Sequence, residues 1–241
     1  MTKKRDEVIT KIKSKGYWSI NIRPVVYMNK LIPDRASVKQ KVRNAAVELR
    51  GWDYPHFSNR GEETYNIING IETVFSWENH VEFWRMTQSG NFFHLLALRE
   101  DRTDLSNFSN LWSTSNELKD KKLLGILGTL YTLIEIFEFT NRLIKQNIYT
   151  NNLIIDIHLH DLYKRQIWVD SQNRLPFFYE RGSQSEEPWQ WKEEYKLNDF
   201  SEKMESNILN PYLDLIDLFG WENPPVDVFK NDIQKFLSGK I

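Results

Sequence analysis

The segment from Arg50 to Phe57, Arg-Gly-Trp-Asp-Tyr-Pro-His-Phe, concentrates side chains that can recognise a ligand. Aromatic rings can stack on a planar ligand or a base, while an arginine and an aspartate fix its edges. The hairpin that follows carries similar side chains, and we expect some of them to join the segment. The candidate ligand-binding or partner-binding residues are Arg50, Trp52, Asp53, Tyr54, His56, Trp77, His80, Trp84, Arg85 and Gln88.

The same cluster has a second interpretation, which is packing. Trp52 and Tyr54 would then close one end of a sheet, with Arg50 and Asp53 pairing at the turn. Aromatic clusters at strand ends more often have this structural role.

A second candidate is the string Asp156-Ile-His158-Leu-His160, followed by Asp161. Side chains alternate along a strand, so Asp156, His158 and His160 share one face and could converge on a metal ion. The solvent face of an amphipathic strand has the same spacing, and a metal site also needs supporting groups around its ligands. The sequence identifies no cofactor.

Two weaker features remain. The basic arm from Lys3 to Lys15 could contact phosphate or an acidic partner, although a solubilising terminus is the simpler interpretation. Gly125 and Gly128, within the apolar run from Leu123 to Ile134, could mark the close approach of a helix or a ligand, with packing against a sheet as the simpler cause.

Composition excludes several classes of protein. The chain has 241 residues, a net charge of −1, nine tryptophans and no cysteine. It therefore lacks disulfides, a thiol nucleophile and a general attraction for nucleic acid. Phosphate-binding glycine loops and nucleophile elbows are absent from the sequence. The charged N-terminus lacks a secretory signal and no apolar run is long enough to span a bilayer, so we expect a cytoplasmic protein.

Hydrophobic periodicity predicts strands and helices in the first half of the chain. We expect a strand over 20–27 that Pro24 places at an edge or bulge, and a helix capped by Asp34 and ended by Gly51. Residues 65–98 alternate like strands, and the turn at 88–91 predicts a hairpin. The polar stretch 100–118 is the expected lobe boundary.

The second half should contain a long central helix over 119–146, buried between two layers. Strands over 153–159 and 166–170 should pair around a turn at 161–164, and 189–197 should form another strand. Helices then begin near 199, restart at Asn210-Pro211 and follow Pro224-Pro225. The predicted class is α+β with predominantly antiparallel strands. We expect one compact unit over 1–241 with two lobes, 1–110 and 111–241.

Three groups of residues carry a family resemblance: Ile22-Arg23-Pro24, Arg50 through His56, and Trp84-Arg85 with Gln88-Ser89-Gly90 and Phe92-Phe93-His94. With them the chain resembles a family of uncharacterised bacterial proteins. Similar segments in that family occur alone or fused to Schlafen-like DNA-binding or ATPase modules. The likeness extends to Ile136–Phe139 and covers most of the chain. It implies a bacterial accessory module and transfers no catalytic residue.

The leading hypothesis is a non-catalytic accessory or sensor module that binds a protein partner or small ligand through the aromatic cluster. A second is a metal-dependent hydrolase or nuclease that uses Asp156, His158 and His160, with Glu138 or Asp161 as a further ligand or base. A third is a nucleic-acid-binding accessory protein that uses the arm and the rings.

Overall fold

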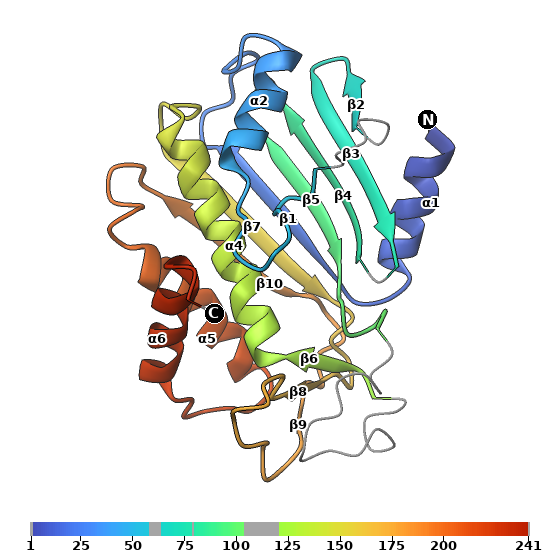
Figure 1. Ribbon diagram of the computed structural model, residues 1–241, viewed down its shortest axis with the longest axis vertical. Coiled ribbons are helices and arrows are strands. Elements are labelled where there is room, and N and C mark those ends of the chain that lie inside the picture. The colour runs from blue at the N-terminus through green and yellow to red at the C-terminus, as the bar shows by residue number, and fades with distance from the viewer. Residues whose placement is uncertain (1, 58–63, 79, 104–120, 241) are drawn as a thin grey trace.

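The computed structural model describes residues 2–57, 64–78, 80–103 and 121–240. Within these residues the main feature is a seven-stranded antiparallel sheet in the order β10-β7-β1-β5-β4-β3-β2 (Figure 1). Its strands are β1 (Tyr17–Pro24), β2 (Thr64–Ile67), β3 (Gly70–Trp77), β4 (His80–Thr87), β5 (Phe92–Ala97), β7 (Leu153–His160) and β10 (Trp189–Tyr195). A small second sheet contains β6 (Leu123–Gly125), β8 (Gln166–Trp168) and β9 (Arg181–Gly182).

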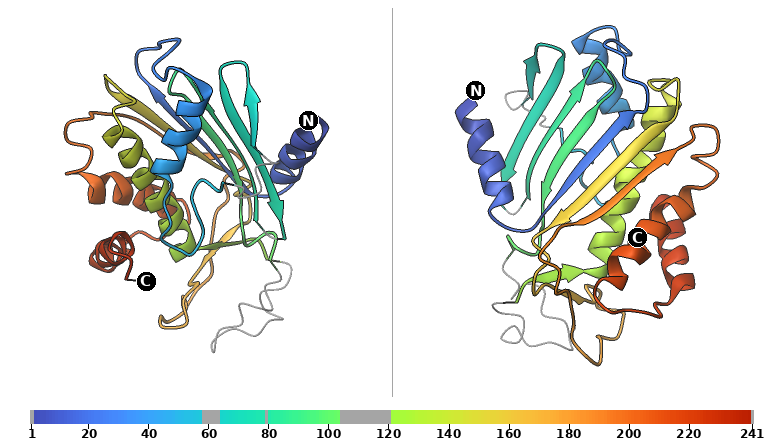
Figure 2. Two further views of the ribbon diagram at one scale, coloured as in Figure 1. Left: turned by 45° about the horizontal axis from the view of Figure 1, so that its top comes forward. Right: turned by 180° about the vertical axis from the view of Figure 1, so that it is seen from behind.

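Helices lie on both faces of the large sheet. They are α1 (Thr2–Lys13), α2 (Arg35–Ala45), α4 (Ile126–Lys145), α5 (Met204–Asp217) and α6 (Val226–Leu237). Helix α4 crosses one face, here called the inner face, and α5 and α6 cover α4 from the other side (Figure 2). The predicted α+β class, the buried central helix and the C-terminal helices are therefore confirmed. The central helix begins at Ile126, later than predicted, because Leu123–Gly125 form strand β6.

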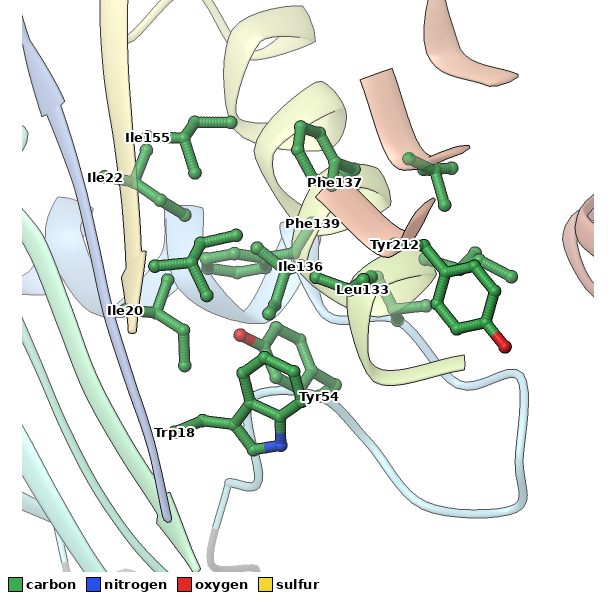
Figure 3. Close-up of a cluster of buried hydrophobic side chains, with 14 of the residues drawn as sticks. Trp18, Ile20, Ile22, Tyr54, Leu133, Ile136, Phe137, Phe139, Ile155 and Tyr212 are labelled. Atoms are coloured by element: carbon green, nitrogen blue, oxygen red, sulfur yellow. The ribbon is translucent and has the colours of Figure 1, made fainter. Parts of the chain in front are cut away.

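The core forms between α4 and the inner face. Every second residue of β1 and β7 is buried, as expected of strands with one covered face. Trp18, Ile20 and Ile22 point from β1 toward Ile136 and Phe139 of α4 (Figure 3). Burying an aliphatic or aromatic side chain of this size contributes about 1.5–3 kcal/mol, so this interface holds the central helix in place.

The outer face has a smaller cluster under α1. Val8 and Ile12 lie four residues apart on this helix and pack against Val74, Val81 and Phe83. The apolar side of α1 therefore docks on the sheet, while its lysines remain at the surface.

Local signals located the start of α2 and the hairpin turn. Asp34 caps α2 by accepting a hydrogen bond from the backbone N–H of Ser37 at 2.7 Å. At the turn, Gly90 has a φ of 79° and its N–H bonds the carbonyl of Thr87. Helix α2 ends earlier than predicted, at Ala45, because the chain leaves it to form a bridge between Val47 and Tyr54.

Three further predictions about strands and helices were wrong. Strand β1 lies inside the sheet and ends at Pro24, so the proline terminates the strand and marks neither an edge nor a bulge. Strands β7 and β8 do not pair with each other, because β7 lies between β1 and β10 while β8 joins β6 and β9. Helix α5 begins at Met204 and continues through Pro211 without a break.

Strand β1 also joins the two halves of the chain. It pairs with β5 on one side and with β7 on the other, so residues from both predicted lobes share one sheet. Most of the predicted boundary over 100–118 lies outside the described residues. In the part of the chain that is described, no helix has the length and apolar character needed to cross a membrane.

Candidate functional site

The Arg50–His56 segment forms a closed loop beside the inner face. Reciprocal backbone hydrogen bonds of 2.9 Å between Val47 and Tyr54 close its base, and Gly51 makes the turn with a φ of 78°. Asp53 braces the loop because it accepts the backbone N–H of Phe57 at 2.9 Å and lies 2.6 Å from His56 Nδ1. The segment is thus a positioned structural element that presents its side chains to the end of the sheet.

Exposed rings gather where this loop meets the β3–β4 hairpin. Trp52 stacks on His80 with 5.8 Å between ring centroids and 13° between planes, and it lies 5.9 Å from Trp77. Trp52 is 48% exposed and Trp77 is 56% exposed. Rings that served only to close the core would be buried, so this group forms a surface wall as well as a packing contact.

This wall borders a pocket of about 810 Å³. The pocket reaches from the loop and hairpin down the inner face to the N-terminal half of α4 and to Asp170, which follows β8. Its lining combines aromatic and acidic side chains with few basic ones. The aromatic residues are Trp18, Trp52, Tyr54, Trp77, Tyr131 and Trp168, and the acidic ones are Asp53, Glu78, Glu82, Glu100, Glu135 and Asp170.

Glu135 and Arg50 form one wall of the pocket. Arg50 donates from Nε to Glu135 Oε1 at 2.8 Å, and its Nη2 bonds the second carboxylate oxygen. Burial raises the pKa of Glu135 above its ordinary value, while the charge of Arg50 opposes that shift. The bidentate pair ties the loop to the central helix.

Glu82 is the centre of a second polar group. Its carboxylate lies 3.0 Å from His80 Nε2 and 3.4 Å from His94 Nε2, and it accepts the backbone N–H of His56 at 2.7 Å. Burial acts to raise the pKa of Glu82, but hydrogen bonds from the two histidines outweigh burial and hold the pKa well below its usual range. Tyr54 extends the chain of contacts, with its OH 3.2 Å from His94 Nδ1.

Two further carboxylates lie at the N-terminus of α4. Asp170 accepts the backbone N–H groups of Leu127 and Gly128 at 2.7 and 2.8 Å, and Glu100 accepts that of Gly125 at 2.9 Å. These bonds satisfy N–H groups that the helix itself leaves unpaired. Burial raises the pKa of both carboxyl groups.

Two glycines at the start of α4, Gly125 just before the helix and Gly128 in its first turn, make room for these carboxylates. A Cβ at Gly125 would collide with the carboxylate of Asp170 and lie 2.9 Å from Glu100 Oε1. A Cβ at Gly128 would lie 3.1 Å from Asp170 Oδ2. The close approach that the glycines suggested is therefore made by acidic side chains.

Thr129, one turn into α4, is a buried polar residue of the pocket lining. It is 3% exposed, and its Oγ1 has no hydrogen-bond partner among the described residues. An unpaired buried hydroxyl costs free energy, so a ligand group that bonds it would be stabilised there.

The structure brings most of the predicted aromatic site together. Arg50, Trp52, Asp53, Tyr54, Trp77 and His80 all line the pocket. His56 lies next to the exposed rings, where its ring contacts those of Trp52 and Phe75.

Three predicted residues lie elsewhere. Trp84 is fully buried and its indole N–H bonds the carbonyl of His56 at 2.7 Å. Arg85 points to the other face of the sheet and pairs with Glu72 at 2.7 Å. Gln88 sits at the far end of the hairpin and bonds the carbonyl of Pro33 at 2.8 Å.

Sequence reasoning missed the acidic side of the pocket, namely Glu82, Glu100, Glu135 and Asp170. Two of these residues carry a detectable signal. Glu135 interrupts an otherwise apolar helical run, and Glu82 occupies the inward position of a strand whose next inward residues are Trp84 and Met86. Glu100 and Asp170 have no comparable local signature.

The proposed metal ligands share one face of β7, as their alternation predicted. His158 Nε2 lies 2.9 Å from Asp156 Oδ1, whereas His160 Nε2 bonds Ser19 Oγ at 3.0 Å. Across the described part of the chain, no three His, Asp or Glu side chains are grouped so that they could hold a metal ion.

The suggested additional ligands are separated from these histidines. Glu138 lies on α4, against the opposite face of the sheet, and pairs with Arg142 at 2.8 Å. Asp161 pairs with Lys122 at 2.6 Å and with Arg165 at 3.2 Å. The expectation that either completes a site with the β7 histidines is therefore not supported by their positions.

Comparison with known proteins gives no independent assignment: no family model matches the chain, and no curated protein and no solved structure matches it. The resemblance to a bacterial family stays a prediction.

Proposed function

We propose that this protein is a non-catalytic accessory or sensor module that binds a small organic ligand. The binding site is the pocket between the Arg50–His56 loop, the end of the β3–β4 hairpin and the N-terminal half of α4. The observation that carries the proposal is the combination of exposed indole rings with buried polar groups around one cavity of about 810 Å³. Pockets for small ligands commonly have about 300–1,000 Å³ and this mixture of residues.

The way the carboxylates are held supports a pre-formed binding site. Arg50 binds both oxygens of Glu135, and two histidines flank Glu82. Groups fixed in this way can orient a ligand, because their positions are already set before it arrives. The Trp52, His80 and Trp77 rings supply apolar surface at the entrance.

The proposal can be tested by thermal-shift screening of the purified full chain against nucleosides, sugars, amines and aromatic acids, followed by calorimetry of any probe that binds. Trp52→Ala should weaken binding by about tenfold, because it removes a large aromatic surface from the pocket lining. Tyr179→Ala is the matched control, since Tyr179 is 83% exposed and outside the pocket.

Two outcomes would overturn this function. One is that the wild-type protein binds none of the probes and retains no small molecule in native mass spectrometry. The other is that Trp52→Ala binds as tightly as the wild type.

A further inference from the structure

We infer that the ligand of this pocket is a protonated organic amine, held with its ammonium group against Glu100 and Asp170 and its apolar part against the indole rings. This inference rests on the proposed function and names the chemical class that the site selects. Six acidic side chains line the pocket, against two arginines and one histidine. The lining therefore favours a cation over a neutral or anionic ligand.

The acidic groups differ in how far they are already neutralised. Glu135 is paired with Arg50, and Glu82 with two histidines. The hydrogen bonds that hold Glu100 and Asp170 come from backbone N–H groups. The charges of Arg165 and Arg99 also act on Glu100 and Asp170, but the two carboxylates lie together at the start of α4, so one cationic ligand group could contact both.

The helix terminus does not reverse this preference. The N-terminus of a helix carries roughly half a positive charge, which often favours an anion. Here Asp170 and Glu100 already occupy the N–H groups at the start of α4. An anionic ligand would meet two carboxylates in place of free donors, so the site disfavours it.

The buried environment of Glu100 and Asp170 also favours a cationic ligand. Burial raises the pKa of Glu100, and the neighbouring Asp170 adds to that shift, whereas Arg165 opposes it. Burial likewise raises the pKa of Asp170, opposed by the charge of Arg99. Ionising both groups is costly at this buried site, and a bound ammonium would offset the cost.

The remaining lining suits the other parts of an amine. Trp18, Tyr131 and Trp168 line the same pocket, and aromatic faces attract a cation and its carbon chain. The unpaired hydroxyl of Thr129 can accept a hydrogen bond from an ammonium N–H. This acceptor favours a primary or secondary amine over a quaternary one.

The test uses three probes with the same indole ring and different end groups: tryptamine (cationic), tryptophol (neutral) and indole-3-acetate (anionic). Isothermal titration at pH 7 should show tryptamine binding at least about tenfold more tightly than tryptophol, with indole-3-acetate weakest. Asp170→Asn and Glu100→Gln should reduce this preference for the amine, because they weaken tryptamine binding by a larger factor than tryptophol binding. Tyr179→Ala is again the control.

The results separate the inference from the function on which it rests. Equal binding of the three probes would overturn the amine assignment and leave a ligand-binding pocket in place. Failure of tryptamine to bind at millimolar concentration would also overturn it, while the wider screen and Trp52→Ala judge the binding function separately. Because Asp170→Asn removes a helix-capping charge, its fold is checked by circular dichroism, and Glu100→Gln gives an independent measurement.

Discussion

Arg50 and Glu135, 85 positions apart in the chain, form a bidentate ion pair with 2.8 Å between Nε and Oε1. The Glu135 side chain is 4% exposed and that of Arg50 is 30% exposed. A carboxylate buried this deeply needs a partner, because burial of an unpaired charge is costly. The pair therefore couples the position of the aromatic loop to the stability of the central helix.

Replacement of Arg50 should reveal this coupling. We expect Arg50→Ala to lower the free energy of unfolding at pH 7 by about 3 kcal/mol, since Glu135 is left without its cation. Arg50→Lys keeps the charge but loses the bidentate geometry, so its loss should be about 1 kcal/mol. Urea unfolding of the three proteins measures both values.

The effect of Arg50→Ala should also depend on pH. The folded-state pKa of Glu135 is already raised by burial, and removal of Arg50 raises it further. A carboxyl group with a raised pKa binds its proton more tightly in the folded than in the unfolded protein. The free energy of unfolding therefore falls as the pH rises above 4.5, the ordinary pKa of this group. The loss should be smaller at pH 5 than at pH 8, and an equal loss at both would contradict the assignment.

Glu82 should show the opposite dependence. Its folded-state pKa is held below the ordinary value of 4.5, so its contribution to stability is present above that pH and is lost as the pH falls below it. We expect Glu82→Gln to cost about 1–3 kcal/mol at pH 7, because it weakens the bonds from His80 and His94. The difference from wild type should shrink between pH 5 and pH 2 in denaturation experiments. A constant difference would mean that Glu82 is not an ionised partner of these histidines.

The aromatic half of the pocket was predictable because it is local in sequence. Trp52 and His56 stand in one dense segment, and the alternation of β3 places Trp77 on the inner face. The acidic half comes from four separate places in the chain. Glu100 follows β5 and Asp170 follows β8, and both reach the start of α4 through contacts between distant segments. That meeting depends on long-range pairing, which periodicity does not encode.

The same distinction explains the errors in the fold. Alternation within β7 and the cap at Asp34 were read correctly because each depends on neighbouring residues. The partner of β7 was misassigned because adjacent strands in sequence often form hairpins. Here β1, more than 100 positions earlier, supplies one of its two partners.

Helix α1 offers a test of how the N-terminal segment contributes to the fold. Ile12 is fully buried against the outer face of the sheet, whereas Ile9 is only partly buried. We expect Ile12→Ala to lower the free energy of unfolding by about 2–4 kcal/mol, as for other buried isoleucines. Ile9→Ala is the matched control with a smaller loss. Equal and small losses in urea unfolding would show that the arm is not docked.

Gly125, which precedes α4, and Gly128, in its first turn, should respond differently to the same substitution. At Gly125 an added Cβ collides with Asp170 and comes within 2.9 Å of Glu100, so Gly125→Ala should cost about 1–3 kcal/mol. At Gly128 the nearest carboxylate oxygen is 3.1 Å away, and alanine gains about 1 kcal/mol of helix propensity over glycine. Gly128→Ala should therefore be close to neutral in thermal unfolding. If Gly125→Ala is equally well tolerated, the carboxylates of Asp170 and Glu100 can move away from the helix. That result would contradict a fixed position of these two groups in the pocket.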